Sequence, residues 1–154
     1  MAEVAIDQLA APLLIEAARA AAAHAHAPYS RFAVGAAVLL ADGEIVTGAN
    51  IENASYGLLL CAETVAIATA SAQGRLRDIV AIGVIGGAIR GGALTGDEPV
   101  RPCGRCRQIL NEAAQAGGRD IIVFCASAED ARIERHLLSA LLPHAFGPAD
   151  LGIA

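Results

Sequence analysis

Two short stretches of the chain carry residues that could act together chemically. The first is Cys61-Ala62-Glu63, and the second is Pro102-Cys103-Gly104-Arg105-Cys106. A Cys-x-x-Cys pair that opens a helix places two sulfurs on one turn, where both can bind one ion. Cys61 would add a third thiolate and leave the fourth tetrahedral position open, which is typical of catalytic rather than structural zinc. The spacing therefore predicts a hydrolytic zinc site.

Glu63 is the candidate proton carrier at this site. It follows Cys61 by two residues, so it could reach a water at the open position without binding the metal. A carboxylate placed there can take a proton from water and pass it to the substrate. Taken alone, an acidic residue in the first turn of a helix is common and requires no function. Beside the three cysteines, we interpret Glu63 as the general acid-base.

The remaining cysteine and the paired histidines have simpler interpretations. A lone Cys-x-x-Cys pair is also compatible with redox or structural thiols, but the upstream Cys61 favours a metal site. Cys125 ends the apolar run 121–125, and we expect an inert core residue. As a fourth zinc ligand it would close the site and abolish catalysis. His24 and His26 have no spacing that links them to the cysteines, so we expect surface or capping residues.

The composition indicates one domain spanning residues 1–154. Apolar residues make up 55% of the chain and aromatics 3%, so aliphatic side chains must fill the core. No apolar run reaches the roughly 18 residues of a membrane span, and the N-terminus lacks a signal-peptide pattern. We therefore expect a cytoplasmic protein without membrane contact, in which four cysteines do not form disulfides. The formal charge of −5 disfavours nucleic-acid partners and favours a free small-molecule substrate.

The apolar pattern predicts alternating helices and strands. We expect helices over 7–25, 61–73, 103–116 and 137–142, and strands over 32–40, 44–50, 79–85, 121–125 and 131–136. Asp42-Gly43 between the first two strands predicts a hairpin. Pro12 is tolerated only near a first turn, which favours a start of the first helix later than residue 7. The glycine-rich segment 86–100 lacks a periodic pattern and is expected to be a mobile loop.

Polar residues gather where the second strand ends, in the run Asn50-Ile51-Glu52-Asn53. One interpretation is a solvated loop. The other is a set of ligand-binding groups, because ligands bind at strand ends in open α/β sheets.

These motifs together resemble the cytidine deaminases, in the short three-cysteine form that assembles as a homotetramer. The order ligand-x-Glu and then Pro-Cys-x-x-Cys marks the zinc nucleobase deaminases. The resemblance runs from Pro28 to Leu151, most of the chain. It is carried by the segments 28–37 (PYSRFAVGAA), 50–56 (NIENASY), 61–63 (CAE), 102–108 (PCGRCRQ) and 146–151 (FGPADL).

The resemblance implies a fold, an assembly and a reaction. The fold is a three-layer α/β/α sandwich around a mixed five-stranded sheet. The reaction is hydrolytic deamination of a free pyrimidine nucleoside, cytidine or deoxycytidine, in pyrimidine salvage. In the homotetramer, Tyr56 and Phe146 reach sites shared between neighbouring subunits. One zinc ion per subunit is held by Cys61, Cys103 and Cys106.

The resemblance also implies the substrate contacts within one subunit. Asn50 and Glu52 hold the ribose hydroxyls, since a carboxylate and an amide suit a sugar diol. Phe32 packs on the pyrimidine, which needs an apolar face. Glu63, together with the backbone at Ala62, reads the edge of the base.

Thr64 stands where the family usually has an arginine that hydrogen-bonds to the thiolates. A threonine hydroxyl offers one neutral donor, so another group should offset the charge of three thiolates. Arg107 follows the last ligand directly and matches the family pattern, so we expect it to take this role and Arg105 to point to solvent. Segment 86–101 is several residues longer than usual and is expected to reshape the site entrance.

Two alternatives remain open on the sequence alone. The blasticidin S type of deaminase shares the cysteine motifs but lacks the Asn-Ile-Glu-Asn run present here, which favours a nucleoside substrate. A zinc-bound interaction module without catalysis is the alternative of another class. Glu63 and the open fourth zinc position argue against that module, and ammonia release from a nucleoside would exclude it.

Overall fold

Runs of β-branched and small apolar residues form one mixed sheet. The computed structural model of the protein describes the backbone of residues 2–153 and the side chains of residues 8–153. The strands follow the order β2-β1-β3-β5-β6, and the short β4 pairs with β3. Among the paired strands of residues 2–153, only β3 and β5 run parallel. The strands are β1 (Phe32–Leu40), β2 (Ile45–Ala49), β3 (Ile79–Arg90), β4 (Ala93–Thr95), β5 (Ile122–Ser127) and β6 (Ile133–Leu137).

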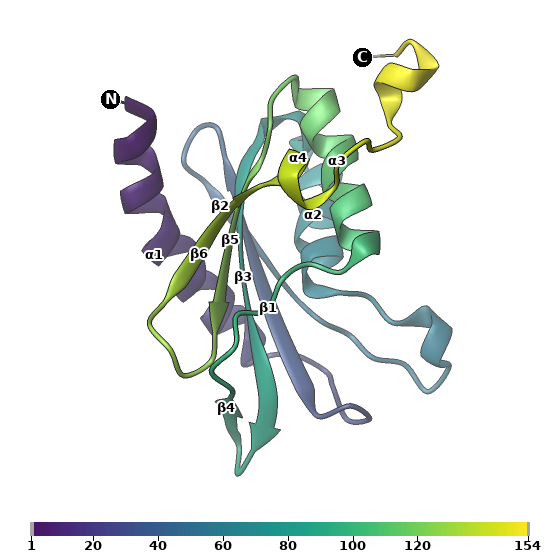
Figure 1. The fold of residues 1–154 in the computed structure, drawn as a ribbon. Coiled ribbons are helices and arrows are strands. Elements are labelled where there is room, and N and C mark those ends of the chain that lie inside the picture. The colour runs from purple at the N-terminus through teal and green to yellow at the C-terminus, as the bar shows by residue number, and fades with distance from the viewer. Residues whose placement is uncertain (1, 154) are drawn as a thin grey trace.

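Helices cover both faces of the sheet. The helices are α1 (Ala2–Ala22), α2 (Ala62–Ala72), α3 (Gly104–Gly117) and α4 (Leu138–Leu141), with 3-10 turns η1 (Tyr56–Leu58), η2 (Leu76–Asp78) and η3 (Pro148–Leu151). Figure 1 shows α1 on one side of the sheet and α2 with α3 on the other. The expected three-layer α/β/α sandwich is therefore confirmed. Five strands form its continuous path, and β4 is an additional sixth strand.

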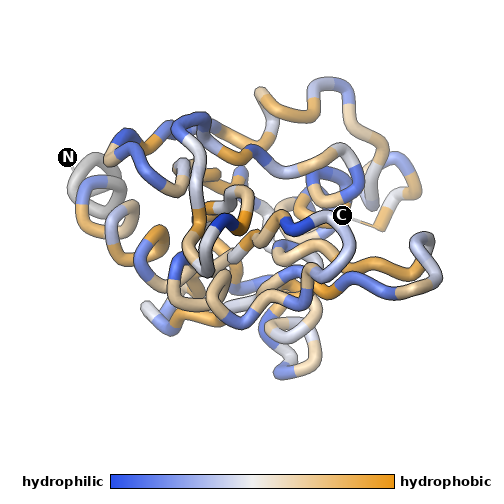
Figure 2. Tube along the Cα trace, turned by 90° about the horizontal axis from the view of Figure 1, so that it is seen from below, coloured by the Kyte–Doolittle hydropathy of each residue, from blue (hydrophilic) through white to orange (hydrophobic). Residues whose placement is uncertain are grey.

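The sheet separates two hydrophobic clusters. One lies under α1 and includes Leu14, Ile85 and Phe124. The other lies under α2 and α3 and includes Ile82 and Leu110. Figure 2 shows hydrophobic segments both inside the molecule and at its outer edge. Among residues 2–153, no helix combines the length and the apolar character that crossing a membrane would require.

The expectation of a loop over 86–100 is wrong for residues 86–95, whereas residues 96–100 form neither helix nor strand. β3 continues to Arg90, and a turn at Gly91 and Gly92 returns the chain as β4. A Cβ atom at Gly87 would lie 2.3 Å from the Thr95 carbonyl oxygen, so the strands approach too closely for a side chain. Gly86 and Gly87, two of the glycines that suggested a loop, thus permit close packing of strands.

The expected start of the first helix is also wrong. α1 begins at Ala2, and Pro12 lies within it. Proline lacks the N–H that an internal helical position donates, which normally disfavours this placement. Leu14 and Ala18 in the following turns are fully buried against the sheet. This tertiary packing helps the helix to continue past the proline.

The expected hairpin and the helix that begins beside Cys61 are confirmed. β1 and β2 pair antiparallel, and Gly43 in the turn has a φ of +93°. α2 lies directly on β2 because Gly48 has no side chain. A Cβ atom at Gly48 would lie 2.5 Å from both the Ala62 carbonyl oxygen and the Ala66 nitrogen. This contact fixes the first turn of α2 against the sheet.

We predict that Gly48→Ala displaces the start of α2. Overpacking of this kind typically costs about 1–3 kcal/mol of unfolding free energy, and the displaced turn should also bind zinc more weakly. Denaturant unfolding and zinc titration measure both effects. Gly57→Ala is the control, because a Cβ atom there meets nothing within 4 Å. Equal stability and zinc affinity in the two variants would show that α2 tolerates the shift.

Candidate active site

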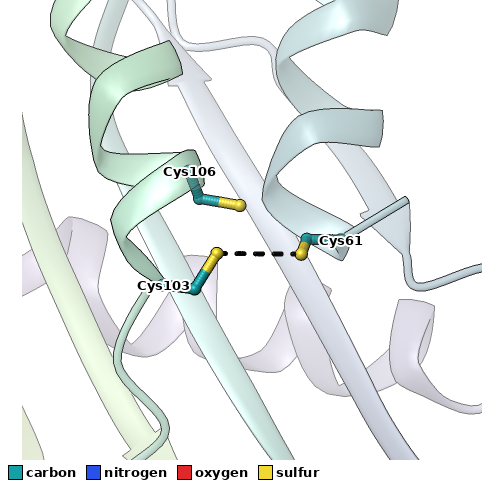
Figure 3. A group of neighbouring side chains, drawn as sticks. All are labelled: Cys61, Cys103 and Cys106. Carbon is teal, nitrogen blue, oxygen red and sulfur yellow. Dashed lines mark hydrogen bonds between the residues drawn. The ribbon is translucent and has the colours of Figure 1, made fainter. Parts of the chain in front are cut away.

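Two helix N-termini bring three sulfurs together. Cys61 is the N-cap of α2, Cys103 is the N-cap of α3, and Cys106 lies in the first turn of α3. The three sulfur atoms lie within 4.8 Å of one another, and the Sγ atoms of Cys61 and Cys103 are 3.9 Å apart. Figure 3 shows the three side chains pointing toward one shared space.

The protein environment opposes the simultaneous ionisation of these thiols. Burial raises the pKa of Cys61, and the neighbouring Cys103 raises it further. Burial also raises the pKa of Cys106, with a contribution from Glu63. Burial acts in the same direction on Cys103, but hydrogen bonds from the Cys106 backbone N–H and from the other two thiols outweigh it and lower its pKa. A cation bound between the sulfurs would favour their ionised forms and so offset these effects on the pKa values.

The sulfur geometry fits zinc. Tetrahedral zinc with bonds of about 2.3 Å to sulfur places ligand sulfurs about 3.8 Å apart. The Sγ atoms of Cys61 and Cys103 are 3.9 Å apart, and no two of the three sulfurs are more than 4.8 Å apart. A small contraction would bring all three separations to this value. The cluster therefore fits one zinc ion with three protein ligands, as the sequence predicted.

Glu63 and Thr64 lie on the α2 side of the cluster. The Glu63 side chain is 4% exposed, and its burial raises the pKa of the carboxyl group. The Thr64 Oγ1 atom lies 3.5 Å from the Cys106 sulfur, within hydrogen-bonding distance. The threonine thus contacts one thiol, as a single neutral donor would.

A cavity of about 220 Å³ opens beside the cysteines. Its walls combine two cysteines, two carboxylates and several aliphatic side chains: Val34, Asn50, Ile51, Glu52, Leu59, Leu60, Cys61, Ala62, Glu63, Val100, Arg101 and Cys103. A groove of about 390 Å³ adjoins it and shares Glu52 and Leu59. An organic substrate bound in the cavity would therefore lie close to both Glu63 and the sulfurs.

The cavity includes two polar residues that the sequence singled out. The Asn50 side chain accepts a hydrogen bond from the Val34 N–H and donates one to the Phe32 carbonyl oxygen. The Glu52 carboxylate accepts a hydrogen bond of 2.8 Å from the Tyr29 N–H. The Ser30 hydroxyl is the largest cause of a lowered pKa at Glu52. Both side chains are thus fixed by the backbone between residues 29 and 34.

The other expected substrate contacts divide into two groups. Ala62 is fully buried and lines the cavity. Phe32 is 40% exposed and is not among the residues described as lining it. Tyr56 and Phe146 are exposed, and Tyr56 makes an edge contact with Tyr29 at a centroid distance of 5.5 Å. In the described chain, these three aromatic rings are not part of the cavity wall.

Sequence reasoning missed several residues of the cavity wall. Val34, Leu59, Val100 and Arg101 contribute to it. Val34 lies two residues after Phe32 in β1, so the alternation of a strand could have suggested it. Val100 and Arg101 come from the segment that was expected to be a loop, and no periodic pattern marks them.

Cys125, His24 and His26 are not among the residues that line the cavity. Cys125 is fully buried in the hydrophobic cluster under α2 and α3, where burial raises its pKa to about 12. Among the described residues, the group able to hold a metal contains only the other three cysteines. His24 and His26 are exposed, as expected.

The two arginines of the second motif make different contacts. Arg107 donates from Nε to the Pro102 carbonyl oxygen at 2.8 Å and from Nη1 to the Leu141 carbonyl oxygen at 2.9 Å. Its guanidinium therefore holds the backbone before Cys103. Arg105 is exposed and donates to the Leu59 carbonyl oxygen at 3.4 Å. These hydrogen bonds go to carbonyl groups rather than to a cysteine sulfur, so they support the peptide before Cys103, and the expected offset of the thiolate charge by Arg107 stays a prediction.

An α/β/α domain with three cysteines and a buried glutamate at two helix N-termini defines the class of zinc nucleobase deaminases. The family model of the cytidine and deoxycytidylate deaminase zinc-binding region matches residues 11–124. The chain belongs to this family.

Individual relatives agree with this assignment. A cytidine deaminase from Halalkalibacterium halodurans is 45% identical over 139 residues, which cover 90% of this chain and 96% of that protein. One from Mycobacterium tuberculosis is 44% identical over 131 residues and 85% of each chain. The crystal structure of a cytidine deaminase from Burkholderia pseudomallei matches with a TM-score of 0.75 at 41% identity. That match covers 88% of this chain and 98% of the other.

We predict that Arg107→Ala weakens zinc binding more than Arg105→Ala does. Loss of the Arg107 side chain leaves the Pro102 and Leu141 carbonyl groups without these donors and loosens the approach to Cys103. Changes in groups that support metal ligands typically cost about 10–100-fold in affinity. Competition with a chromogenic chelator measures the zinc affinity of both variants. Equal effects would show that the helix N-termini and backbone amides alone offset the thiolate charge.

Proposed function

We propose that the protein hydrolyses cytidine and deoxycytidine to uridine and deoxyuridine and releases ammonia. The observation that carries this proposal is the burial of Glu63 in a cavity that it shares with two of the three clustered cysteines. Family membership and relatives named as cytidine deaminases support the nucleoside substrate over a blasticidin S-type compound. The physiological role would be pyrimidine salvage in the cytoplasm.

Glu63 moves the protons in this proposal. The zinc ion, when bound by Cys61, Cys103 and Cys106, supplies the Lewis acidity that activates water. As the water oxygen bonds to the amine-bearing carbon, the Glu63 carboxylate would take one water proton and deliver it to the ring nitrogen. It would then carry the second proton to the amine, which leaves as ammonia when the C–N bond breaks. The raised pKa of Glu63, caused by burial, suits a group that must take up and return a proton. Because the carboxyl group is enclosed, it exchanges that proton with substrate rather than with bulk solvent.

The sugar and the base would be held by separate groups. Asn50 and Glu52 bind the ribose hydroxyls, and the hydrogen bonds that already fix both side chains favour this role. The backbone at Ala62 reads the edge of the base together with Glu63. Phe32 lies two residues before Val34 in β1, and we propose that it covers the pyrimidine face when substrate is bound.

We further propose that residues 1–154 form a single catalytic domain that assembles as a homotetramer. Tyr56 and Phe146 have exposed fractions of 71% and 63%. Large aromatic side chains that remain exposed often become buried in an interface. Each would complete the cavity of a neighbouring subunit. Neither nucleic acid nor a membrane is a partner in this proposal.

A panel of aminated substrates tests the activity. Ammonia release is measured with cytidine, deoxycytidine, adenosine, free cytosine and blasticidin S on the zinc-loaded protein. Turnover of the two cytosine nucleosides above all others supports the proposal. Preference for blasticidin S would support the other deaminase type, and bound zinc without turnover of any compound would indicate a non-catalytic zinc module.

Glu63→Gln should retain zinc and the fold but lose turnover. Glutamine keeps the shape of the side chain but cannot carry the proton, and general acid-base help is typically worth about 10²–10⁴ in rate. Steady-state turnover of cytidine is compared with the zinc content and the unfolding midpoint of the same sample. Turnover near that of the unmodified protein would exclude Glu63 as the proton carrier.

The proposed assembly predicts that activity depends on protein concentration. Sedimentation at micromolar concentration should give four times the mass of the chain, because the exposed aromatic residues are buried between subunits. On dilution, activity should fall in parallel with dissociation, since each cavity lacks its neighbour's contribution. A monomer that keeps full activity per chain would contradict both the tetramer and the shared sites.

A further inference from the structure

The charges around the catalytic cavity are unevenly neutralised. Three charged side chains other than cysteine line it: Glu52, Glu63 and Arg101. Arg101 is the only basic residue among the described residues in this wall. The segment that bears it is held in place, because the Val100 N–H donates to the Ala126 carbonyl oxygen at 3.1 Å. Among the residues that line this wall, Arg101 is therefore the one that could give an anionic part of a substrate a positive partner.

Arg101 is already paired with a residue outside the cavity. Its Nε and Nη2 atoms donate to the two carboxylate oxygens of Glu134 in β6, at 2.9 Å and 2.6 Å. This two-point contact is the strongest form of an arginine-carboxylate pair. His136 lies 3.0 Å from the same carboxylate and ties it further to β6. The hydrogen bonds from Arg101 are the largest cause of the lowered pKa of Glu134, so its carboxyl group is ionised at neutral pH.

We propose that Glu134 determines specificity by neutralising Arg101, so that the cavity favours uncharged nucleosides over their 5′-phosphates. The inference rests on the proposed deamination of cytosine nucleosides. With Arg101 paired, Glu52 leaves the wall negative, and a phosphate at this wall would meet repulsion with no unpaired cation among the described lining residues. Glu134 itself need not touch the substrate, since it acts through the guanidinium. The family description names both cytidine, a nucleoside, and deoxycytidylate, a nucleotide. A charge pair of this kind would distinguish the uncharged substrate from the phosphorylated one.

Glu134→Gln tests this role without removing the cavity wall. Glutamine keeps the length of the side chain and one acceptor for Arg101 but removes the negative charge. The measured quantity is the kcat/KM for deoxycytidine 5′-monophosphate divided by the kcat/KM for deoxycytidine. We expect this ratio to rise about tenfold, the low end of what one hydrogen bond between charged groups contributes. The rise should shrink at high salt, because exposed charges are screened.

Two further variants separate charge from structure. Glu112→Gln makes the same change in net charge on α3, where Glu112 is exposed and outside the catalytic cavity, so its ratio should stay constant. The double variant Glu134→Gln with Arg101→Met should lose the gain, because the released cation is absent. An unchanged ratio in Glu134→Gln, or a gain that survives in the double variant, would overturn the proposal.

Binding measurements distinguish this inference from the proposed function. Calorimetry with uridine 5′-monophosphate and uridine reports the same preference without turnover. Tighter binding of the monophosphate to Glu134→Gln than to the unmodified protein supports the charge mechanism even if cytidine is not turned over. Turnover of cytidine combined with no change in monophosphate binding overturns the charge mechanism and leaves the proposed deamination standing.

Discussion

The structure depends on the meeting of two helix N-termini around three sulfurs. Cys61 begins α2 and Cys103 begins α3, and each helix is anchored to the same face of the sheet. Helix N-termini favour negative charge, yet burial works against the ionisation of Cys61 and Cys106. Zinc would settle this opposition, because a dication is the strongest local charge and its binding energy is also folding energy. Packing of the helices and metal binding are therefore coupled.

The sheet sets how tightly these helices can approach. At Gly48, α2 lies so close to β2 that a methyl group would overlap the helix backbone. Glu63 in the same turn is buried, and this burial raises the pKa of its carboxyl group. The turn of α2 that packs at Gly48 thus carries both Cys61 at its N-cap and, two residues later, the proposed proton carrier. The chemistry is therefore a consequence of backbone geometry as much as of side-chain identity.

The sequence predicted those features that depend on local spacing. The zinc ligands, the Asp42-Gly43 hairpin and the helix that follows Cys61 were predicted because their patterns span few residues. The extension of β3 through Gly86 and Gly87 was missed. Glycine is required there because segments distant in the sequence pack too closely for a side chain, and not because the chain turns. Helix α1 likewise continues through Pro12 where tertiary packing on the sheet outweighs propensity. Local sequence patterns thus could not predict the features that depend on long-range contacts.

Asn50 and Glu52 illustrate how a fold prepares polar groups before a ligand arrives. The Asn50 amide uses one N–H and one oxygen lone pair on the backbone of β1, which leaves a second N–H and a second lone pair. Glu52 accepts from backbone N–H groups of residues 29 and 30 and still has lone pairs to offer. The conformational entropy of both side chains is already lost during folding, so a sugar diol would not have to order them on binding. The same backbone bonds keep the Glu52 charge at the cavity, where it acts against an incoming anion.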